Sequence, residues 1–520
     1  MTDKSTLQTQ AEDMTGRDKF AWNVITSWGS YLVFFVAGFI VPRMIDDYAG
    51  QVSLGIWDFC WSFINYISLS NLGIGTAINR YVAVHRASGQ LEELSKIVSS
   101  TVFIQIGIAA VVLLATAAVA WSLPVFFVEK LGSELNTAVW VVILLGAALA
   151  VEMAVNWARG VITGCHRWDL NSGLNAAGRF LAVVGMVAVL VAGGGLIGLG
   201  VVYLVVTVLT ELVRIMIARR ICPELVIGYQ FISRAHGLEA FQFGGKAMIF
   251  SLPALMLVQT TNILLVAKLG PAALAVFSRP VALVRHMEGF LSRFSMILTP
   301  TAGVLHQAGS AAELREFLLT STKYGVAFTL PIVLLLVCFG DVVLDLWMGP
   351  EYANWWLMTI FALGYFLPVS QGSVYRVLMG MGHHGKVAVL SLLLSIATFI
   401  AGALLIDRLG WDLIGAALLV TVPLTLSNGI LLPIFACRKL EIPLHNYLGQ
   451  VFLRPIALNA VFFLVLVACR WFFGDTPLLG LLIACVTGGA VLAVMYWWYL
   501  VPAQVRYDWR NTAIAKRLGL

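Results

Sequence analysis

The sequence predicts an all-α integral membrane protein, and three observations lead to this prediction. First, 60% of the 520 residues are hydrophobic and 12% are charged, whereas soluble proteins contain about 45–50% apolar and about 25% charged residues. Second, the apolar residues form runs of about 20–25 residues, the length of a membrane-spanning helix. Third, these runs lack the alternation of barrel strands. A disordered chain, a coiled coil and a nucleic-acid-binding protein are excluded, because each needs more charge.

These runs predict about 14 transmembrane helices. They cover residues 20–42, 54–78, 99–123, 136–160, 172–193, 195–218, 243–267, 272–300, 320–345, 354–378, 387–407, 410–436, 450–473 and 477–501. Of the 33 Lys and Arg residues, 23 lie in segments that share a side with the N-terminus, and five lie in the opposite loops. The positive-inside rule therefore places both termini in the cytoplasm, which requires an even number of spans.

The order of the spans predicts two six-helix lobes followed by two more helices. The longest internal polar stretch comes after six spans, and we interpret it as a linker between the lobes. We expect a cytoplasmic N-terminal tail (1–19), an N-lobe (20–221), a cytoplasmic linker (222–242), a C-lobe (243–440), helices 13 and 14 (441–502) and a cytoplasmic C-terminal tail (503–520).

An internal repeat supports this division into lobes. A shift of 220 residues places Gly50 on Gly270 and Gly89 on Gly309. The identities are few, but the order of apolar blocks also repeats. Internal repeats are common in secondary transporters, which bind their substrates between the repeats. The repeat therefore indicates a transporter.

Four segments carry a resemblance to a known family. They are NVITSWGSYLVFFVAGFIVP (23–42), GIWDFCWSFINYISLSNLGIGTAINRYVA (55–83), GCHRWDLNS (164–172) and LDLWMGPEY (344–352). In this order and spacing they resemble the polysaccharide, or O-antigen, flippase family of the multidrug/oligosaccharidyl-lipid/polysaccharide exporter superfamily. The resemblance implies fourteen helices in two lobes, a central cavity, and movement of undecaprenyl-diphosphate-linked sugar units across the bacterial inner membrane.

The eighth span contains the most informative charged residues of the sequence. Arg279, His286 and Arg293 recur every seven residues, so they form one stripe along a helix. Arg285 points elsewhere and can pair with Glu288 one turn later. Charges inside a bilayer indicate a cavity, and guanidinium groups bind phosphate oxygens bidentately. We predict that the Arg and His residues bind a diphosphate and that Glu288 is a gating or ion-coupling candidate. The alternative is that they pair with acids of other helices and only stabilise the bundle.

Other polar residues in or beside spans are candidates for gating, ion coupling or cavity entry. Asp58 is a candidate for a gate or for a site that binds H⁺ or Na⁺, and a buried ion pair without a transport role is the alternative. Glu152, Asn156 and Arg159 lie at helical spacing and predict either a polar stripe that faces the cavity or a helix–helix network. Arg80 follows the Gly-Ile-Trp helix, and the resemblance implies that it takes the diphosphate at the cavity entry; a lipid-headgroup contact is the alternative.

Several other polar residues are interpreted as structural. Glu211 and Arg214 are three residues apart and predict a local ion pair. The seven cysteines form no CxxC pattern, and the paired histidines lack carboxylate or thiol partners at ligand spacing, so no metal site is expected. The sequence has no Walker A motif and no nucleophile elbow. We therefore expect no catalytic residues, no cofactor and no enzymatic activity.

The sequence thus predicts a flippase of the bacterial inner membrane that works by alternating access and serves O-antigen, capsule or exopolysaccharide synthesis. Its expected partners are the lipid-linked oligosaccharide, membrane lipids, a polysaccharide polymerase, a chain-length regulator and a coupling H⁺ or Na⁺, but no nucleic acid. A multidrug or organic-cation antiporter of the same superfamily is the main alternative. A membrane glycan polymerase or glycosyltransferase and a non-transporting scaffold are two others.

Overall fold

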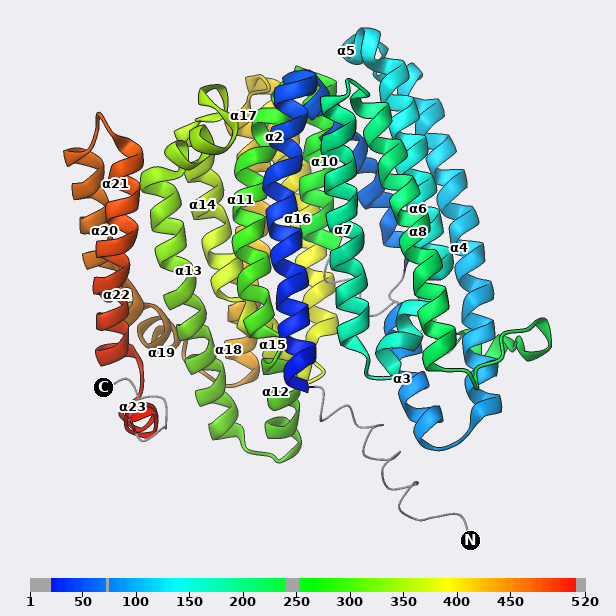
Figure 1. The fold of residues 1–520 in the computed structure, drawn as a ribbon. Helices are drawn as coiled ribbons and strands as arrows, with labels where there is room; N and C mark the ends of the chain where they lie inside the picture. The colour runs from blue at the N-terminus through cyan, green and yellow to red at the C-terminus, as the bar shows by residue number, and fades with distance from the viewer. Residues whose placement is uncertain (1–19, 72–73, 239–251, 511–520) are drawn as a thin grey trace. The chain divides into compact units, whose positions relative to one another are not determined.

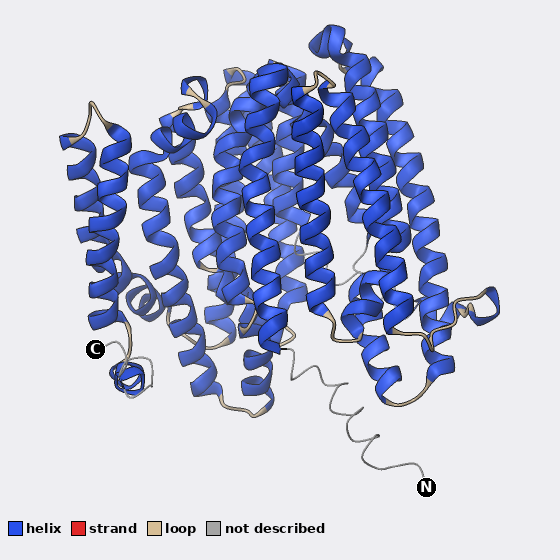
Figure 2. Cartoon of the chain, in the orientation of Figure 1, coloured by secondary structure: helices blue, strands red, loops and turns tan. Residues whose placement is uncertain are grey.

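The computed structural model describes residues 20–71, 74–238 and 252–510, and every regular element in these ranges is a helix (Figures 1 and 2). The predicted N-terminal tail, the end of the predicted linker, the start of the seventh predicted span and the last ten residues lie outside the described ranges. Contacts along the chain define two compact units, Met1–Val276 and Phe277–Leu520, and each is described by itself. The lobe boundaries predicted from the sequence stay a prediction.

The first unit contains long helices that pack side by side. Its helices are α2 (Phe20–Ile67), α3 (Ile74–Ala87), α4 (Leu91–Phe126), α5 (Val128–Leu131), α6 (Leu135–Gly164), α7 (Trp168–Val191), α8 (Gly195–Ile221) and α10 (Leu252–Leu269), and the first residues of α11 (Pro271–Ser295). Helix α6 packs against α4 and α8, while α2 packs against α7 and α10 (Figure 1). The apolar faces of these helices supply the contacts that hold the unit together.

The second unit contains the rest of α11 and the following helices, several of which are interrupted. They are α12 (Leu298–Gln307), α13 (Ala311–Met348), α14 (Trp355–Ser370), α15 (Gly372–Gly380), α16 (His384–Leu409), α17 (Leu413–Leu424), α18 (Leu432–Lys439), α19 (Leu444–Leu448), α20 (Arg454–Phe472), α21 (Pro477–Ile483), α22 (Gly489–Met495) and α23 (Ala503–Arg510). π-Helical turns join α17 to α18, α19 to α20 and α21 to α22. Helix α13 packs against both α14 and α20.

Twelve helices in the described residues are long and apolar enough to cross a membrane, compared with the fourteen predicted spans. Two features account for the difference. The first two predicted spans lie in one continuous segment, Trp22–Ser70, which bends at Gly50, where φ is +84°. The predicted loop between them is therefore helical except at this glycine. The eighth predicted span is α11, whose Arg and Glu residues make it less apolar than the others. The prediction of an all-α, many-spanning membrane protein is confirmed.

The internal repeat is clearer in the backbone angles of the glycines than in the identity of the side chains. Gly50 and Gly270, 220 residues apart, have φ of +84° and +90°, and Gly89 and Gly309 have φ of +70° and +71°. Both members of the second pair end a turn that is followed by a long helix, α4 or α13. A φ in this range is accessible to glycine without strain. Glycine therefore suits all four of these positions.

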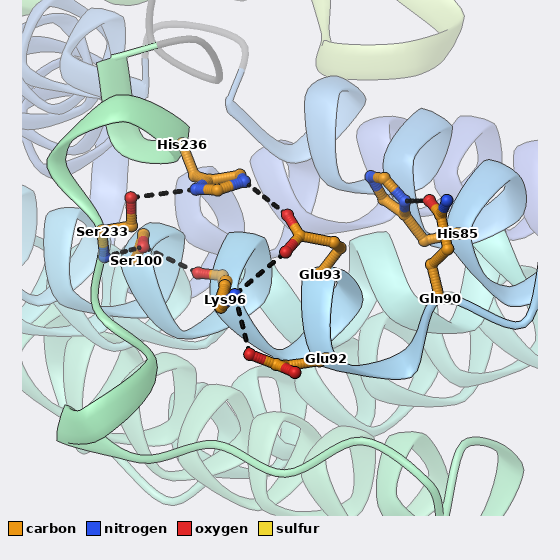
Figure 3. A network of polar contacts seen from close by, with 8 residues as sticks. All are labelled: His85, Gln90, Glu92, Glu93, Lys96, Ser100, Ser233 and His236. Carbon is orange, nitrogen blue, oxygen red and sulfur yellow. Dashed lines mark hydrogen bonds and ion pairs between the residues drawn. The ribbon is translucent and has the colours of Figure 1, made fainter.

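Beyond α8, the chain runs back over the start of α4 (Figure 3). The buried hydroxyls of Ser95, Ser99 and Ser100 accept hydrogen bonds from the backbone N–H groups of residues 226, 228 and 233, at 3.3, 3.2 and 2.8 Å. The His236 ring lies between Ser233 Oγ and Glu93 Oε2, at 2.9 Å from each. Backbone donors without regular structure need such partners. This part of the predicted linker, residues 222–238, is thus fixed to the first unit.

An ion pair holds the start of the same segment. Arg86 Nε donates to Glu224 Oε1 at 2.7 Å, and about a quarter of each side chain is exposed. Burial favours the neutral carboxyl, but hydrogen bonds from the Glu224 backbone N–H and from Arg86 outweigh it. The pKa of Glu224 therefore lies below its usual value. The ionised carboxylate is the form that the folded segment stabilises.

Gly55 provides a test of the close approach between α2 and the start of α11. A Cβ at Gly55 would overlap the carbonyl oxygen of Pro271, whereas a Cβ at Gly29 on the same helix would meet no atom within 4 Å. We expect Gly55→Ala to destabilise the protein by about 1–3 kcal/mol, because a backbone atom must move. Gly29→Ala should be neutral or stabilising by up to about 1 kcal/mol. Thermal unfolding in detergent, followed by tryptophan fluorescence, measures both; equal melting temperatures would contradict the contact.

The Arg86–Glu224 pair predicts a pH-dependent stability of the segment. The folded-state pKa of Glu224 is lowered, so its contribution is complete above the usual glutamate pKa of about 4.3 and is lost as the pH falls through the lower folded value. At pH 7 we expect Glu224→Gln to cost about 1 kcal/mol and to speed hydrogen exchange of residues 222–238 about fivefold. This difference should vanish in acid. The exposed Glu129→Gln variant is the control, and a difference that persists at all pH values would argue against the ion pair.

Candidate functional site

A buried polar network lies inside the first unit and is centred on Arg214, which is 1% exposed. Its Nε donates to Glu211 Oε2 at 2.8 Å, its Nη1 to Asn171 Oδ1 at 2.6 Å, and its Nη2 to Asn175 Oδ1 at 2.8 Å. Glu211 and Arg214 are one turn apart on α8, while Asn171 and Asn175 are one turn apart on α7. The predicted Glu211–Arg214 pair is confirmed. All three guanidinium nitrogens have a partner, so Arg214 joins α7 to α8.

A second group of charges lies beside this network. Tyr203 OH donates to Glu152 Oε1 at 3.4 Å, and Arg179 extends over the Phe34 ring with its guanidinium carbon 4.5 Å from the centroid. Arg159 is attracted by Glu152 and Glu211 and repelled by Arg214. Its Nε is buried and has no hydrogen-bond partner.

The structure thus brings together two of the predicted residues of α6, Glu152 and Arg159, with charges of α7 and α8. Asn156, between them, is 5% exposed. Sequence reasoning recognised Arg179 as an arginine inside a span but gave it no partner, and it missed Tyr203, because each is a single residue on another helix. Their polar character inside an apolar span was the available signal. The incompletely bonded Arg159 gives this group a donor that a ligand or a neighbouring charge can use.

Asp58 lies half-buried on α2, one turn before a polar seam between α2 and α10. In this seam Asn262 Nδ2 donates to Ser62 Oγ at 3.1 Å, and Tyr66 OH lies 3.1 Å from the Met256 carbonyl and bonds to Thr260. Sequence reasoning did not identify the seam. Arg80 is exposed on α3, away from a helix end. The assignments of Asp58 and Arg80 to gating and to cavity entry stay predictions.

Helix α11 carries the predicted basic stripe of the second unit. Arg279 is 2% exposed, and its guanidinium carbon lies 5.8 Å from the ring centroid of Trp347 on α13. His286 and Arg293 are half-buried, whereas Arg285 and Glu288 are exposed. The helix therefore changes from a buried cation at one end to accessible charges farther along. Exposed and half-buried guanidinium groups on an apolar helix provide donors for an anion.

The described residues give no sign of a metal centre. In them no group of three or more His, Cys, Asp or Glu residues could hold an ion. The seven cysteines are free thiols. The polar chemistry of the described chain therefore consists mainly of guanidinium, carboxylate, amide and hydroxyl groups.

Comparison with known structures defines the class of fold. Lipid II flippase MurJ in an inward closed conformation has a TM-score of 0.68 and 12% identity, over 92% of this chain and 99% of that chain. An inward-facing multidrug resistance MATE family transporter of the MOP superfamily has a TM-score of 0.65 and 15% identity, over 79% and 94%. A MOP superfamily transporter from Pyrococcus furiosus has a TM-score of 0.59 and 13% identity, over 82% and 96%. The fold is that of the MOP superfamily transporters.

The sequence itself defines the family. Residues 17–306, more than half of the chain, match the family described as polysaccharide biosynthesis protein. A comparison with curated protein sequences gives no match. The chain belongs to the polysaccharide biosynthesis protein family, and the resemblance predicted from its motifs is confirmed.

The Arg214 network provides a test of which charges are structural. Arg214→Met leaves Glu211 buried without its partner, so we expect a loss of about 3–5 kcal/mol in the free energy of unfolding. The double variant Glu211→Met/Arg214→Met should lose less than Arg214→Met alone, because no unpaired charge remains. Denaturant or thermal unfolding in detergent measures both. Arg219→Met, which removes an exposed arginine of the same helix, should change stability by less than about 0.5 kcal/mol. A double variant that is less stable than the single one would show that the pair is not the stabilising contact.

Proposed function

We propose that this protein flips undecaprenyl-diphosphate-linked oligosaccharide across the bacterial inner membrane by alternating access, for the synthesis of a surface polysaccharide. The observation that carries the proposal is α11, a helix of 25 residues with three arginines and a histidine. By insertion scales, each arginine at the centre of a bilayer costs about 2.5–3.5 kcal/mol. Arginines at such positions therefore usually have a function. The family to which the chain belongs supports a glycan substrate.

The diphosphate is the part of the substrate that α11 suits. A diphosphate carries two or more negative charges, and its oxygens accept paired hydrogen bonds from guanidinium groups. Arg285, Arg293 and His286 are accessible or half-accessible for this contact, and Arg279 adds positive charge at the buried end of the helix. The sugar units would then occupy the polar cavity, while the prenyl chain stays in the bilayer.

The charged group of the first unit is proposed to couple transport to an ion. Glu152 accepts a hydrogen bond from Tyr203, and the positive charges of Arg159 and Arg179 attract its carboxylate. A carboxylate in such surroundings can bind H⁺ or Na⁺ and thereby change the balance of charge inside the unit. Asp58 and Glu288 are the other candidates for this role. Arg80 is proposed to contact the diphosphate at the cavity entry.

The location and partners follow from the same proposal. The chain is a multi-pass membrane protein. We propose that it lies in the bacterial inner membrane with both termini in the cytoplasm, as the positive-inside rule favours. A polysaccharide polymerase and a chain-length regulator would use the flipped units. We propose no catalytic activity for the chain.

A multidrug or organic-cation antiporter is the second candidate. The MATE structures share the fold, which fits both functions. Such an antiporter would favour an acidic, aromatic cavity, and Glu152 and Glu211 with Tyr203 offer one acidic group. However, Glu211 is neutralised by Arg214 at 2.8 Å, and α11 adds positive charge. The balance of charge favours an anionic substrate.

Two substitutions in α11 test the proposal. We expect Arg279→Ala and Arg293→Ala each to lower surface glycan by about tenfold or more in a deletion strain of the native host, because each removes charged donors to the diphosphate. The protein should still insert at wild-type amounts, which an immunoblot of membranes checks. Arg293 is half-buried, so its variant reports on function if Arg279→Ala is unstable. Arg408→Ala, an exposed arginine at the end of α16, is the matched control.

The result also separates the two candidate functions. Wild-type amounts of surface glycan in both α11 variants would contradict the proposal that α11 binds the diphosphate. Normal glycan display after deletion of the whole gene, together with organic-cation resistance that depends on the protein, would favour the antiporter instead. Resistance is measured in a host that lacks its own drug exporters.

A further inference from the structure

The second unit contains a pair of cations that the proposed transport site does not use. Lys323 lies on α13, and Arg454 is the first residue of α20. Helices α13 and α20 pack against each other, so the positive charge of Arg454 acts on Lys323. Among the described residues neither forms an ion pair; the acid that acts on Lys323 is Glu316, two turns earlier on the same helix. Two neighbouring cations without a bound carboxylate form a positive surface that can bind an anion from outside the chain.

The two cations lie one helical turn from residues of a small apolar cluster. The cluster consists of Ala327, Leu458 and Leu500, with Tyr324, Met495 and Tyr496 packed against them. Lys323 and Arg454 each precede a cluster residue by one helical turn, on α13 and α20 respectively. Because both helices run in the same direction from this end, the two cations lie at the same level of the bundle.

Hydrogen bonds hold the cluster and bring the C-terminal segment to it. Tyr496 OH donates to the Ala327 carbonyl at 2.5 Å and accepts from Asn459 Nδ2 at 2.7 Å. Tyr324 OH donates to the Leu500 carbonyl at 3.4 Å, and Lys323 Nζ lies 5.6 Å from the centroid of the Tyr324 ring. The site is thus built on two helices and on the end of a third.

A third cation lies a short distance along the chain from Leu500. Helix α23 begins at Ala503 and lies across the direction of α22 (Figure 1). Its Arg506 places the guanidinium carbon 5.4 Å from the Trp498 ring centroid, and Arg506 Nε is buried without a hydrogen-bond partner. A short helix that lies across the spanning helices is typical of the membrane interface.

We propose that Lys323 and Arg454 bind the phosphate of an anionic phospholipid headgroup, and that Arg506, in the segment that follows Leu500, adds a third cation to this basic surface. The surroundings favour a lipid over free phosphate, because large apolar side chains next to the cations are open to the bilayer: Leu453 is 70% exposed, Trp498 53% and Tyr499 63%. Basic pockets between spanning helices on the cytoplasmic side are suited to anionic headgroups. The bound lipid would hold α20 and α23 against α13. Its residues are different from those of the proposed diphosphate-binding helix, α11.

Lipid binding to the purified full-length chain in detergent tests the site. Native mass spectrometry is used with phosphatidylglycerol, phosphatidylcholine and inorganic phosphate as probes. We expect phosphatidylglycerol to bind better than phosphatidylcholine, and Lys323→Gln/Arg454→Gln to weaken its binding about 10- to 30-fold, since each cation near an anionic headgroup contributes to binding. Arg438→Gln/Lys439→Gln removes two exposed cations of α18, the same charge, and should leave the affinity within about twofold.

Each outcome decides the proposal. The charge-conserving variant Lys323→Arg/Arg454→Lys should bind phosphatidylglycerol within about threefold of wild type, which separates charge from folding. If the double Gln variant does not fold, Arg454→Gln alone, at an exposed position, carries the comparison. Equal binding by the wild type and the Gln variant, or equal binding of phosphatidylcholine, overturns the site. If millimolar inorganic phosphate displaces the lipid completely, the ligand of the site is free phosphate and not the lipid. Loss of lipid binding with normal glycan export would leave the proposed function intact.

Discussion

The cost of placing charge in a medium of low dielectric constant is the constraint on which this structure depends. For Arg214 this cost is offset within the protein by hydrogen bonds to Glu211, Asn171 and Asn175. The charges of α11 have other surroundings. Arg279 lies beside the ring of Trp347, and Arg285 is exposed. Charges that are fully hydrogen-bonded inside the protein stabilise the fold, and exposed ones can contact a ligand. The same reasoning separates the structural network of the first unit from the proposed diphosphate-binding helix.

The motifs that carry the family resemblance are largely contacts between helices. Asn23 Oδ1 accepts a hydrogen bond from the Asp169 backbone N–H at 2.9 Å, and the hydroxyls of Ser27 and Ser172 are 3.2 Å apart. These contacts join the segments 23–42 and 164–172, and Asn171 of the second segment also binds Arg214. The motifs therefore fix α2, α7 and α8 to one another. This explains why they identify the family but do not identify a substrate.

The internal repeat preserves backbone geometry but not chemistry. The glycines at matching turns have similar positive φ angles. Under the 220-residue shift, however, Arg279 corresponds to Phe59, and Arg285 to Asn65. The charge that distinguishes α11 therefore has no counterpart in the matching helix of the first unit. Helix packing constrains turns and lengths more than it constrains a polar surface, so two helices at matching positions can differ in charge.

The sequence alone determined the all-α membrane class, the approximate positions of the spans and the family, because long apolar runs can satisfy their backbone in lipid only as helices. It also predicted the Glu211–Arg214 pair, which depends on helical spacing within one element. Only the tertiary structure decided that α2 continues as a helix to Gly50, and that Arg179 and Tyr203 join Glu152. It also decided that α13, which carries Lys323, packs against α20, which begins at Arg454. These contacts depend on the packing of helices that are distant in the chain, and periodicity within a single helix carries no information about its neighbour.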